Sequence, residues 1–376
     1  MRERRPRTIL SVIGTRPEAI KMAPVVEALA HREDAVRSVV CVTGQHREML
    51  DPVLSLFSIA PTVDLDVMQP GQTLAGLTSR LIDGLDRVCR EVEPDWVLVQ
   101  GDTTTAMAGA LVAFYRGTRL GHVEAGLRSG DLRRPFPEEL NRRLADLVAD
   151  AHFAPTARAR DVLLAEGVPS DRIRVTGNTV VDALLRVAAL PYDWSSGPLA
   201  QVPSDRRLVT ITAHRRESFG APFRELCLAV RDLAERHGDE VQFVYPVHLN
   251  PRVREPVMRL LSGVAGVTLL DPLDYQSLVQ LMKASELVLT DSGGLQEEAP
   301  SLGVPVLVMR EVTERPEGIE AGVARLVGTD RRVIRQEVSR LLADAEARAA
   351  MAAAANPYGD GNAGERVVEC LLETPA

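Results

Sequence analysis

The chain has 376 residues, of which 45% are hydrophobic and 26% are charged, which is the composition of an ordinary globular protein. This composition excludes disordered, collagen-like and coiled-coil chains, and at about 150 residues per domain the length favours two domains. Because the formal net charge is −8 and aromatic residues make up 4%, we expect no nucleic-acid partner.

Cysteine usage and the distribution of apolar residues bear on the compartment. The four cysteines lie far apart without a C-x-x-C pair, which favours free thiols in a reducing compartment over a zinc site or a disulfide framework. No apolar run approaches the roughly 18 residues that span a bilayer, and the N-terminus lacks a signal-peptide pattern. We therefore predict a soluble, cytoplasmic protein with no membrane partner.

Short β-branched runs recur along the chain, and each is followed by a polar or glycine turn and a stretch of helical periodicity. Continuous apolar strands that alternate with helices are typical of parallel sheets buried on both faces. The expected strands occupy 8–15, 38–44, 96–101, 120–126, 151–155, 172–177, 208–214, 241–248, 267–273, 287–294, 304–310 and 324–330. This order predicts an α/β protein with two doubly wound domains facing across a cleft, joined by a Pro-, Ser- and Gly-rich linker over 186–206.

Ligands of open α/β sheets bind beyond the carboxyl ends of the strands, and the first such segment is GTRPEAIK (14–21). Arg16 projects from this turn and Lys21 lies about one helical turn further on. Two cations at a helix N-terminus are unfavourable unless an anion is present, which favours diphosphate binding. The alternative is that both side chains only decorate a helix start.

Carboxylates mark the next strand ends. Asp102 and Glu124 each follow an apolar strand directly, where a carboxylate is costly unless it is paired or functional. The segment PFPEELNRRL (135–144) adds Glu138 and Arg142 at an i, i+4 spacing, which exposed salt bridges would also explain. Converging carboxylates permit general acid and base catalysis from opposite faces of a substrate.

The second half offers two histidines and a glycine-rich turn. His214 and His248 close its first two strands, where either could donate to a phosphate or assist a leaving group. DSGGLQEEAP (291–300) places glycines between a strand and a helix N-terminus, a geometry that binds phosphate, with Glu298 positioned for ribose hydroxyls. The alternative is a helix cap with a surface glutamate. The sequence contains no H-E-x-x-H and no G-x-G-x-x-G pattern, so we expect neither a catalytic metal nor a nicotinamide cofactor.

Eleven motifs in order resemble those of the bacterial non-hydrolysing UDP-N-acetylglucosamine 2-epimerases over about residues 8–370. They are GTRPEAIKMAPV, TGQHREML, GDTTTA, GHVEAGLRSGD, PFPEELNRR, VTGNTVVDAL, TAHRRESFG, YPVHLNP, TDSGGLQEEAP, TERPEGIEAG and NPYGDG. The resemblance implies two Rossmann-like domains in a GT-B-like arrangement. It assigns the catalytic carboxylates to a domain over 1–185, completed by a returning C-terminal helix at about 360–376, and UDP binding to a domain over 186–359.

The resemblance also implies an activity and the residues that carry it. Family members are usually homodimers that interconvert UDP-GlcNAc and UDP-ManNAc without an organic cofactor, by eliminating UDP to 2-acetamidoglucal and adding it back; the product supplies cell-surface polysaccharide. Matched motif by motif, the positions of this chain that resemble the family's catalytic residues are Asp102, Glu124, Glu138, Arg142 and His214. Those that resemble its UDP-contacting residues are Arg16, Lys21, His248, Ser292, Gly293, Gly294, Glu298 and Arg315.

Members of the family are often activated by UDP-GlcNAc in a second pocket, and Gln45, His46 and Arg215 lie in motifs associated with it. The chain departs from some members there, with Gly71 in place of an arginine and Glu48 in place of a glutamine. Three other functions remain open from sequence: a UDP-sugar-dependent glycosyltransferase, a hydrolysing epimerase that releases ManNAc, and a catalytically silent nucleotide-sugar sensor.

Overall fold

The computed structural model describes residues 5–44, 47–69 and 71–374. The chain divides into two compact units, Met1–Ala183 with Tyr358–Ala376 (unit 1) and Leu184–Pro357 (unit 2). Within the described residues, no helix is both long enough and apolar enough to cross a membrane.

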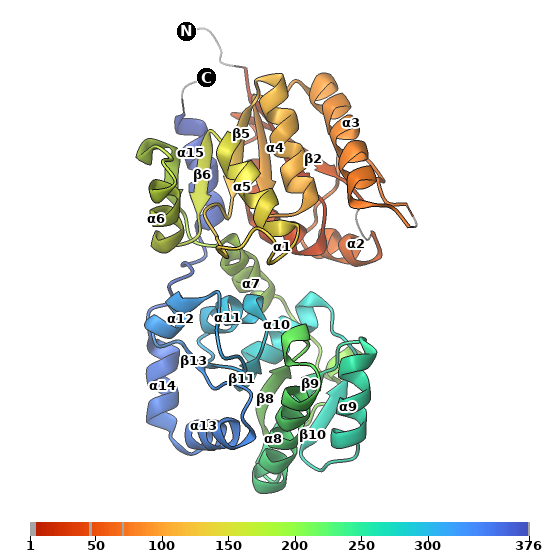
Figure 1. Cartoon of the computed structure of the whole chain (residues 1–376), viewed down its shortest axis with the longest axis vertical. Helices are drawn as coiled ribbons and strands as arrows, with labels where there is room; N and C mark the ends of the chain where they lie inside the picture. The colour runs from red at the N-terminus through yellow and green to blue at the C-terminus, as the bar shows by residue number, and fades with distance from the viewer. Residues whose placement is uncertain (1–4, 45–46, 70, 375–376) are drawn as a thin grey trace. The chain divides into compact units, whose positions relative to one another are not determined.

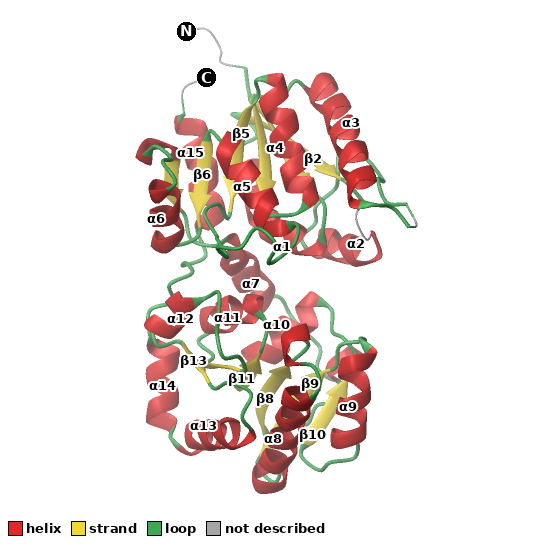
Figure 2. Cartoon of the chain, in the orientation of Figure 1, coloured by secondary structure: helices red, strands yellow, loops and turns green. Residues whose placement is uncertain are grey.

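Unit 1 is a parallel sheet covered by helices (Figures 1 and 2). Its strands lie in the order β3-β2-β1-β4-β5-β6-β7. The elements are β1 (Arg7–Ile13), α1 (Arg16–Ala30), β2 (Val36–Val42), α2 (Arg47–Leu56), β3 (Val63–Asp64), α3 (Leu74–Val92), β4 (Trp96–Gln100), α4 (Thr104–Arg116), β5 (Arg119–Val123), α5 (Glu138–Val148), β6 (Ala151–Ala154), α6 (Ala157–Ala165), β7 (Ile173–Val175), the start of α7 (Thr179–Ala189), which continues into unit 2, and α15 (Ala363–Glu373).

The C-terminal helix α15 belongs to unit 1 because it packs on α1. Its Val367, Val368 and Leu371 are fully buried. Gly364 permits the close approach, since a Cβ at this position would lie 2.8 Å from the backbone of Pro24. The first and last helices of the unit are therefore one packed layer.

Unit 2 is a second parallel sheet with helices on it, in the order β10-β9-β8-β11-β12-β13 (Figure 2). The elements are β8 (Arg207–Thr212), α8 (Ala221–His237), β9 (Val241–Pro246), α9 (Pro251–Leu261), β10 (Val267–Leu270), α10 (Tyr275–Lys283), β11 (Ser285–Thr290), α11 (Gly293–Ser301), β12 (Val306–Val308), α12 (Pro316–Glu320), β13 (Ala324–Leu326), α13 (Arg331–Ala343) and α14 (Ala345–Ala353). The strand runs expected from sequence all contain observed strands, and the two-residue β3 is additional.

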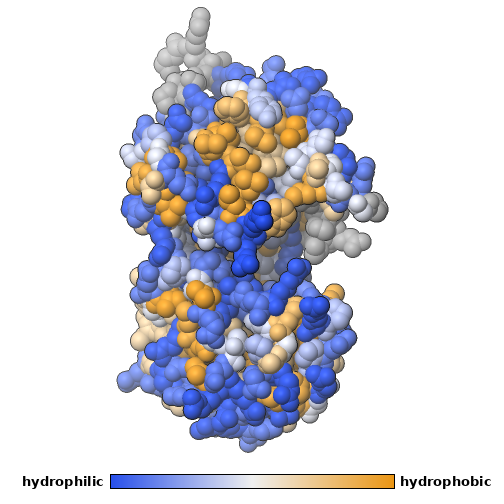
Figure 3. All heavy atoms as spheres, viewed as in Figure 1, coloured by the Kyte–Doolittle hydropathy of each residue, from blue (hydrophilic) through white to orange (hydrophobic). Residues whose placement is uncertain are grey.

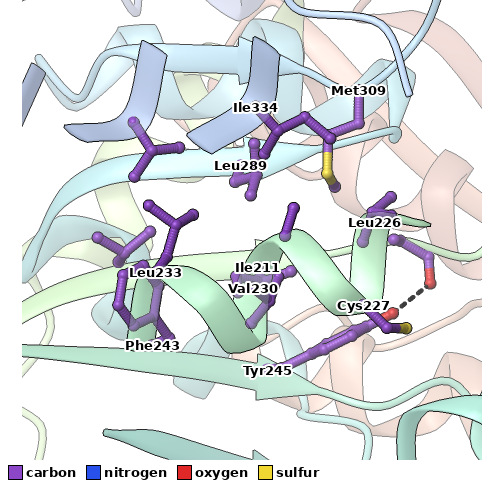
Figure 4. Close-up of a cluster of buried hydrophobic side chains, with 14 of the residues drawn as sticks. Ile211, Leu226, Cys227, Val230, Leu233, Phe243, Tyr245, Leu289, Met309 and Ile334 are labelled. Carbon is purple, nitrogen blue, oxygen red and sulfur yellow. Dashed lines mark hydrogen bonds between the residues drawn. The ribbon is translucent and has the colours of Figure 1, made fainter. Parts of the chain in front are cut away.

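The core of unit 2 forms between the central strands and α8 (Figure 4). Ile211 and Leu289 project from adjacent strands toward Leu226 and Val230 of α8, and all four are fully buried. Tyr245 is also buried, and its hydroxyl donates to the carbonyl of Ala213 at 2.7 Å. This bond satisfies the buried phenol and fixes the chain where it leaves β8.

The segment 186–206, interpreted from its Pro, Ser and Gly content as the linker region, is ordered and packs on unit 2. Helix α7 continues through it to Ala189. Leu199 and Val202 are then buried in a hydrophobic cluster of unit 2, with Tyr192 and Trp194 packed against it. Apolar side chains spaced between the Pro and Gly residues provide enough buried surface to hold this irregular segment on unit 2.

Each sheet changes its direction of winding at one point. In unit 1 this point lies between β1 and β4, and in unit 2 it lies between β8 and β11. The loops that leave two such strands diverge to opposite sides of the sheet and open a crevice at the carboxyl edge. The residues that follow β1, β4, β8 and β11 are therefore the first place to look for a site.

Candidate functional site

The turn after β1 is held by a buried carboxylate. Thr15 is the N-cap of α1 and forms a capping box with Glu18. One Glu18 oxygen accepts from the backbone amides of Gly14 and Thr15 at 3.1 and 2.6 Å, and the other accepts from the Thr103 hydroxyl at 2.8 Å. Burial raises the pKa of Glu18 to about 7. Glu18 thus ties the turn after β1 to the turn after β4, and Arg16 is half-buried at the start of α1.

Asp102 stands in the turn after β4, behind Gly101, whose φ of +70° favours glycine. Its carboxylate forms an ion pair with Arg142 of α5. Its carbonyl accepts from the side-chain amide of Asn141 at 2.9 Å. The structure therefore brings together Asp102 and Arg142, which lie 40 residues apart in sequence.

Glu124 follows β5 in the left-handed region, at φ +65°. Its carboxylate pairs with the Lys21 ammonium of α1 and accepts from the Gln100 amide at 3.2 Å. A left-handed glutamate is strained, and such strain concentrates at functional sites. Lys21 thus lies on a carboxylate of the same edge, a contact that sequence reasoning did not anticipate.

Glu138 opens α5, and its Oε2 is buried without a hydrogen-bond partner in the described part of the chain. Of the two i, i+4 salt bridges considered from sequence, Glu139–Arg143 forms, but with a buried rather than an exposed glutamate, and Arg142 pairs with Asp102. Glu139 is fully buried, where it pairs with Arg143 at 3.0 Å and approaches Arg142 at 3.5 Å. Because Arg142 pairs with Asp102, this charged side chain of α5 lies at the carboxyl edge of the sheet rather than in solvent.

In unit 2, His214 follows β8 and stacks on His248, which follows β9, with ring centroids 5.3 Å apart and planes 16° apart. Asp291, after β11, is fully buried, and its Oδ2 accepts from the backbone amides of His214 and Arg215 at 2.8 Å each. The His214 Nδ1 lies 3.7 Å from Asp291 Oδ1. Burial lowers the pKa of His214, while the charge of Asp291 opposes that shift.

The SGG turn begins helix α11, with Ser292 as its N-cap. Side-chain atoms already lie 3.1 to 3.3 Å from where a Cβ would stand on Gly293, so glycine keeps the backbone amides approachable there. Glu298 is buried further along the helix. Its neighbour Glu297 pairs with Arg315, which caps α12.

Of the residues considered for a second pocket, only Arg215 can be described. It pairs with Glu314 at 2.6 Å, and Glu314 also contacts Arg310. Although burial opposes ionisation, these guanidinium groups lower the pKa of Glu314 to about 2. Gln45 and His46 lie outside the described residues.

Several residues at the carboxyl edges of the two sheets were not predicted from the sequence. Glu18 was recoverable, because T-x-x-E before an apolar run signals a capping box. Asp291 was also recoverable, because it follows an apolar strand directly, as Asp102 and Glu124 do. Asn141 carried no local signal, because it acts through the backbone carbonyl of a distant loop. In the described ranges, no group of three or more His, Cys, Asp or Glu is arranged to hold a metal ion.

The sequence is similar to one family of known proteins over most of its length. A family model described as UDP-N-acetylglucosamine 2-epimerase matches residues 28–372. The UDP-N-acetylglucosamine 2-epimerase of Escherichia coli strain K12 is 55% identical over 369 residues, which cover 96% of this chain and 98% of that protein.

Two solved structures are similar over almost the full chain. The crystal structure of UDP-GlcNAc 2-epimerase from Neisseria meningitidis bound to UDP-GlcNAc has a TM-score of 0.87 and 45% identity, covering 98% of this chain and 100% of that one. The Methanocaldococcus jannaschii UDP-GlcNAc 2-epimerase in complex with UDP-GlcNAc and UDP has a TM-score of 0.78 and 33% identity, covering 97% and 99%. The similarity therefore extends over both units.

Proposed function

The chain belongs to the UDP-N-acetylglucosamine 2-epimerase family, and we propose that it reversibly inverts C2 of UDP-GlcNAc to give UDP-ManNAc without hydrolysis. The observation that carries this proposal is the set of carboxylates at the carboxyl edge of unit 1. Asp102 and Glu124 follow adjacent strands, and each is paired with a cation from another element.

The chemistry explains why such a set is needed. The hydrogen on C2 is not acidified by a neighbouring carbonyl, so a base cannot remove it directly. If the C1–O bond to UDP breaks with oxocarbenium character, C2–H becomes acidic and a carboxylate removes the proton. The bonding pair of C1–O leaves with UDP, and the C2–H pair forms the double bond of 2-acetamidoglucal.

Return of the proton to the opposite face of C2 and re-addition of UDP at C1 complete the inversion. This step requires a proton donor on the other side of the ring, which general acid–base groups at two positions can supply. We assign these tasks to Asp102, Glu124 and Glu138, with Arg142 holding Asp102. His214, whose pKa is lowered by burial, is assigned to the departing UDP.

UDP binding is assigned to groups that present donors. The N-terminus of α11 with Ser292, Gly293 and Gly294 suits a diphosphate, because free backbone amides and the helix dipole both favour an anion. The other proposed contacts are Arg16, Lys21, His248, Glu298 and Arg315. The relatives crystallised with UDP-GlcNAc, and with UDP-GlcNAc and UDP, support this ligand class.

One experiment tests the reaction and separates it from its rivals. The protein is incubated with UDP-GlcNAc in D₂O, and the sugar is followed by NMR. Deuterium at C2 together with UDP-ManNAc is the expected result. Free ManNAc would indicate a hydrolysing enzyme, and the absence of exchange would indicate a glycosyltransferase or a sensor, so either result refutes the proposal.

We further propose that UDP-GlcNAc activates the enzyme through a second pocket that includes Gln45, His46 and Arg215. The support is that Arg215 is already fixed by Glu314, so its guanidinium is preorganised for an anion. Activation predicts that UDP-ManNAc alone reacts slowly and that traces of UDP-GlcNAc accelerate it. A full rate with UDP-ManNAc alone would contradict this proposal.

We also propose that the protein is a homodimer and that its product feeds cell-surface polysaccharide. Apolar side chains gather over α4 and α5 (Figure 3). Phe114, Tyr115 and Leu147 are exposed by 61, 70 and 79%, and exposed patches of this kind mark protein contacts. Light scattering should give twice the 40.9 kDa chain mass, and Leu147→Glu should shift it toward the monomer. A wild-type monomer would refute the dimer.

A further inference from the structure

A fully buried histidine lies beneath the proposed catalytic edge, outside every role assigned so far. His122 is the fourth residue of β5 and its side chain is inaccessible to solvent. Its Nδ1 lies 2.6 Å from Asp146 Oδ1 of α5, and its Nε2 lies 2.8 Å from the carbonyl oxygen of Gly101. Gly101 is the residue that precedes Asp102.

Both partners of His122 are acceptors, which determines its charge. Asp146 is a carboxylate at neutral pH because, apart from His122, Arg128 pairs with its Oδ2 at 2.8 Å and the backbone amide of Gly126 donates to the same oxygen. A carbonyl oxygen cannot donate. Both ring nitrogens must therefore carry hydrogens, and His122 is an imidazolium.

Asp146 extends this contact to the second loop. Its Oδ2 accepts from the backbone amide of Gly126 at 3.2 Å and pairs with Arg128 at 2.8 Å. Gly126 lies two residues after Glu124, where a φ of +87° and the backbone of Ala159 leave no room for a side chain. Through one carboxylate, the loop that carries Glu124 is joined to the loop that carries Asp102.

Helix α5 completes the arrangement. Asp146 lies on the same helix as Glu138, Asn141 and Arg142. The three segments that present Asp102, Glu124 and Glu138 are therefore all joined at the His122–Asp146 pair. A displacement of about 1 Å in reacting groups can cost 10²-fold in rate, so this joint has a direct bearing on turnover.

We propose that the buried His122–Asp146 ion pair is a positioning centre that sets the three carboxylates relative to one another. Its catalytic consequence rests on the proposed epimerase function, whereas its charge state does not. The pair does not touch the substrate. It acts through the Gly101 carbonyl and the Gly126 amide.

Two substitutions separate the bonds of His122. Asparagine places its amide nitrogen near the position of Nδ1 and keeps the donor to Asp146. Glutamine places its amide nitrogen near Nε2 and keeps the donor to Gly101. If the bond to Gly101 positions Asp102, His122→Gln should retain more activity than His122→Asn, although both remove the charge. His31→Gln, at the exposed end of α1, is the matched control.

Activity is measured first on the wild-type protein by deuterium incorporation at C2, because absence of exchange there refutes the proposed function and not the positioning centre. Given exchange, we expect His122→Asn to lower kcat about 10²-fold, His122→Gln less, and His31→Gln not at all. The Kd for UDP, measured by calorimetry, should stay within about threefold. Wild-type kcat in both His122 variants, or equal losses in both, would overturn the proposal.

The charge is tested independently on the wild-type protein by ¹⁵N NMR of the histidine rings at pH 8. Two ring N–H signals for His122 are expected, at a pH where an ordinary histidine is neutral. A neutral ring would overturn the charged centre. Each variant is checked by circular dichroism, and Asp146→Asn serves as a second way to break the pair. If none of the three variants folds, the pair is structural and the catalytic assignment fails.

Discussion

A buried carboxylate secures the first loop of the crevice in each unit, but the two units complete it differently. Glu18 in unit 1 and Asp291 in unit 2 each accept from two consecutive backbone amides with one oxygen. The second oxygen of Glu18 is bonded to Thr103, whereas Oδ1 of Asp291 has no hydrogen-bond partner among the described residues.

This difference means that the polar groups of the two units differ in whether they are already hydrogen-bonded before a ligand binds. In unit 1 both oxygens of Glu18 are bonded within the protein, and Asp102 and Glu124 are each paired with a cation, so these three carboxylates are fixed before any substrate arrives. In unit 2 the unpaired oxygen lies 3.7 Å from a half-exposed histidine, so a bond can form once His214 moves. The buried carboxylate Glu18 of unit 1 is therefore fully bonded, whereas Asp291 of unit 2 keeps one oxygen unpaired among the described residues. The following predictions test that contrast.

The largest effect is expected from the carboxylates of unit 1. Asp102→Asn and Glu124→Gln should each lower kcat by about 10²- to 10⁴-fold, because each removes a general acid–base group. UDP affinity should change little, since these groups are assigned to the sugar. Steady-state kinetics and calorimetry check both statements, and near-wild-type turnover in both variants would remove them from the chemistry.

The next effect concerns Glu18 and pH. Because burial raises its pKa to about 7 in the folded chain, the folded state holds more protons than the unfolded state between about pH 4.5 and 7. The free energy of unfolding should therefore fall across this window as pH rises, by up to about 3 kcal/mol. Glu18→Gln should flatten this slope in urea unfolding. An unchanged slope would show that Glu18 is ionised in the folded protein.

Substituting Asp291 in unit 2 should lower kcat less than substituting the carboxylates of unit 1. Asp291→Asn keeps the shape but removes the charge beside His214, which should lower the pKa of His214 further and reduce kcat about 10-fold. The pH profile of kcat distinguishes this from loss of structure, because only an electrostatic role shifts its limb. A profile that keeps its midpoint would mean that Asp291 supports the loop alone.

The smallest effects come from the two helix caps. The Thr103 hydroxyl accepts from the Ala106 amide at 3.0 Å, whereas Ser292 makes no such side-chain bond. Thr103→Ala removes this cap and also the bond from the Thr103 hydroxyl to buried Glu18, so it should cost about 1 to 2 kcal/mol of stability. Ser292→Ala should leave the urea midpoint unchanged while weakening UDP binding. Equal destabilisation by Thr103→Ala and Ser292→Ala would contradict the contrast between the fully bonded turn of unit 1 and the turn of unit 2.

Much of this architecture can be predicted from short patterns in the sequence. The strands follow from apolar runs, and their polar ends make Asp102, Glu124 and His214 candidates because the parallel strands of each sheet share a carboxyl edge. The partners do not follow, since Arg142 reaches Asp102, and Lys21 reaches Glu124, only through tertiary packing. The apolar residues of 186–206 were a local sign of burial, but the cluster of unit 2 that Leu199 joins is formed only by tertiary packing.

The return of the chain to unit 1 has a practical consequence for dissection. Residues 184–357 are topologically an insertion, because both ends of the chain belong to unit 1. A stop codon after Pro357 would remove α15 and strip a hydrophobic layer from α1, so the amino-terminal fragment should misfold or aggregate. A separately expressed unit 1 therefore needs its last helix joined back by a short peptide, and a limited proteolysis pattern should show the two fragments of unit 1 remaining associated.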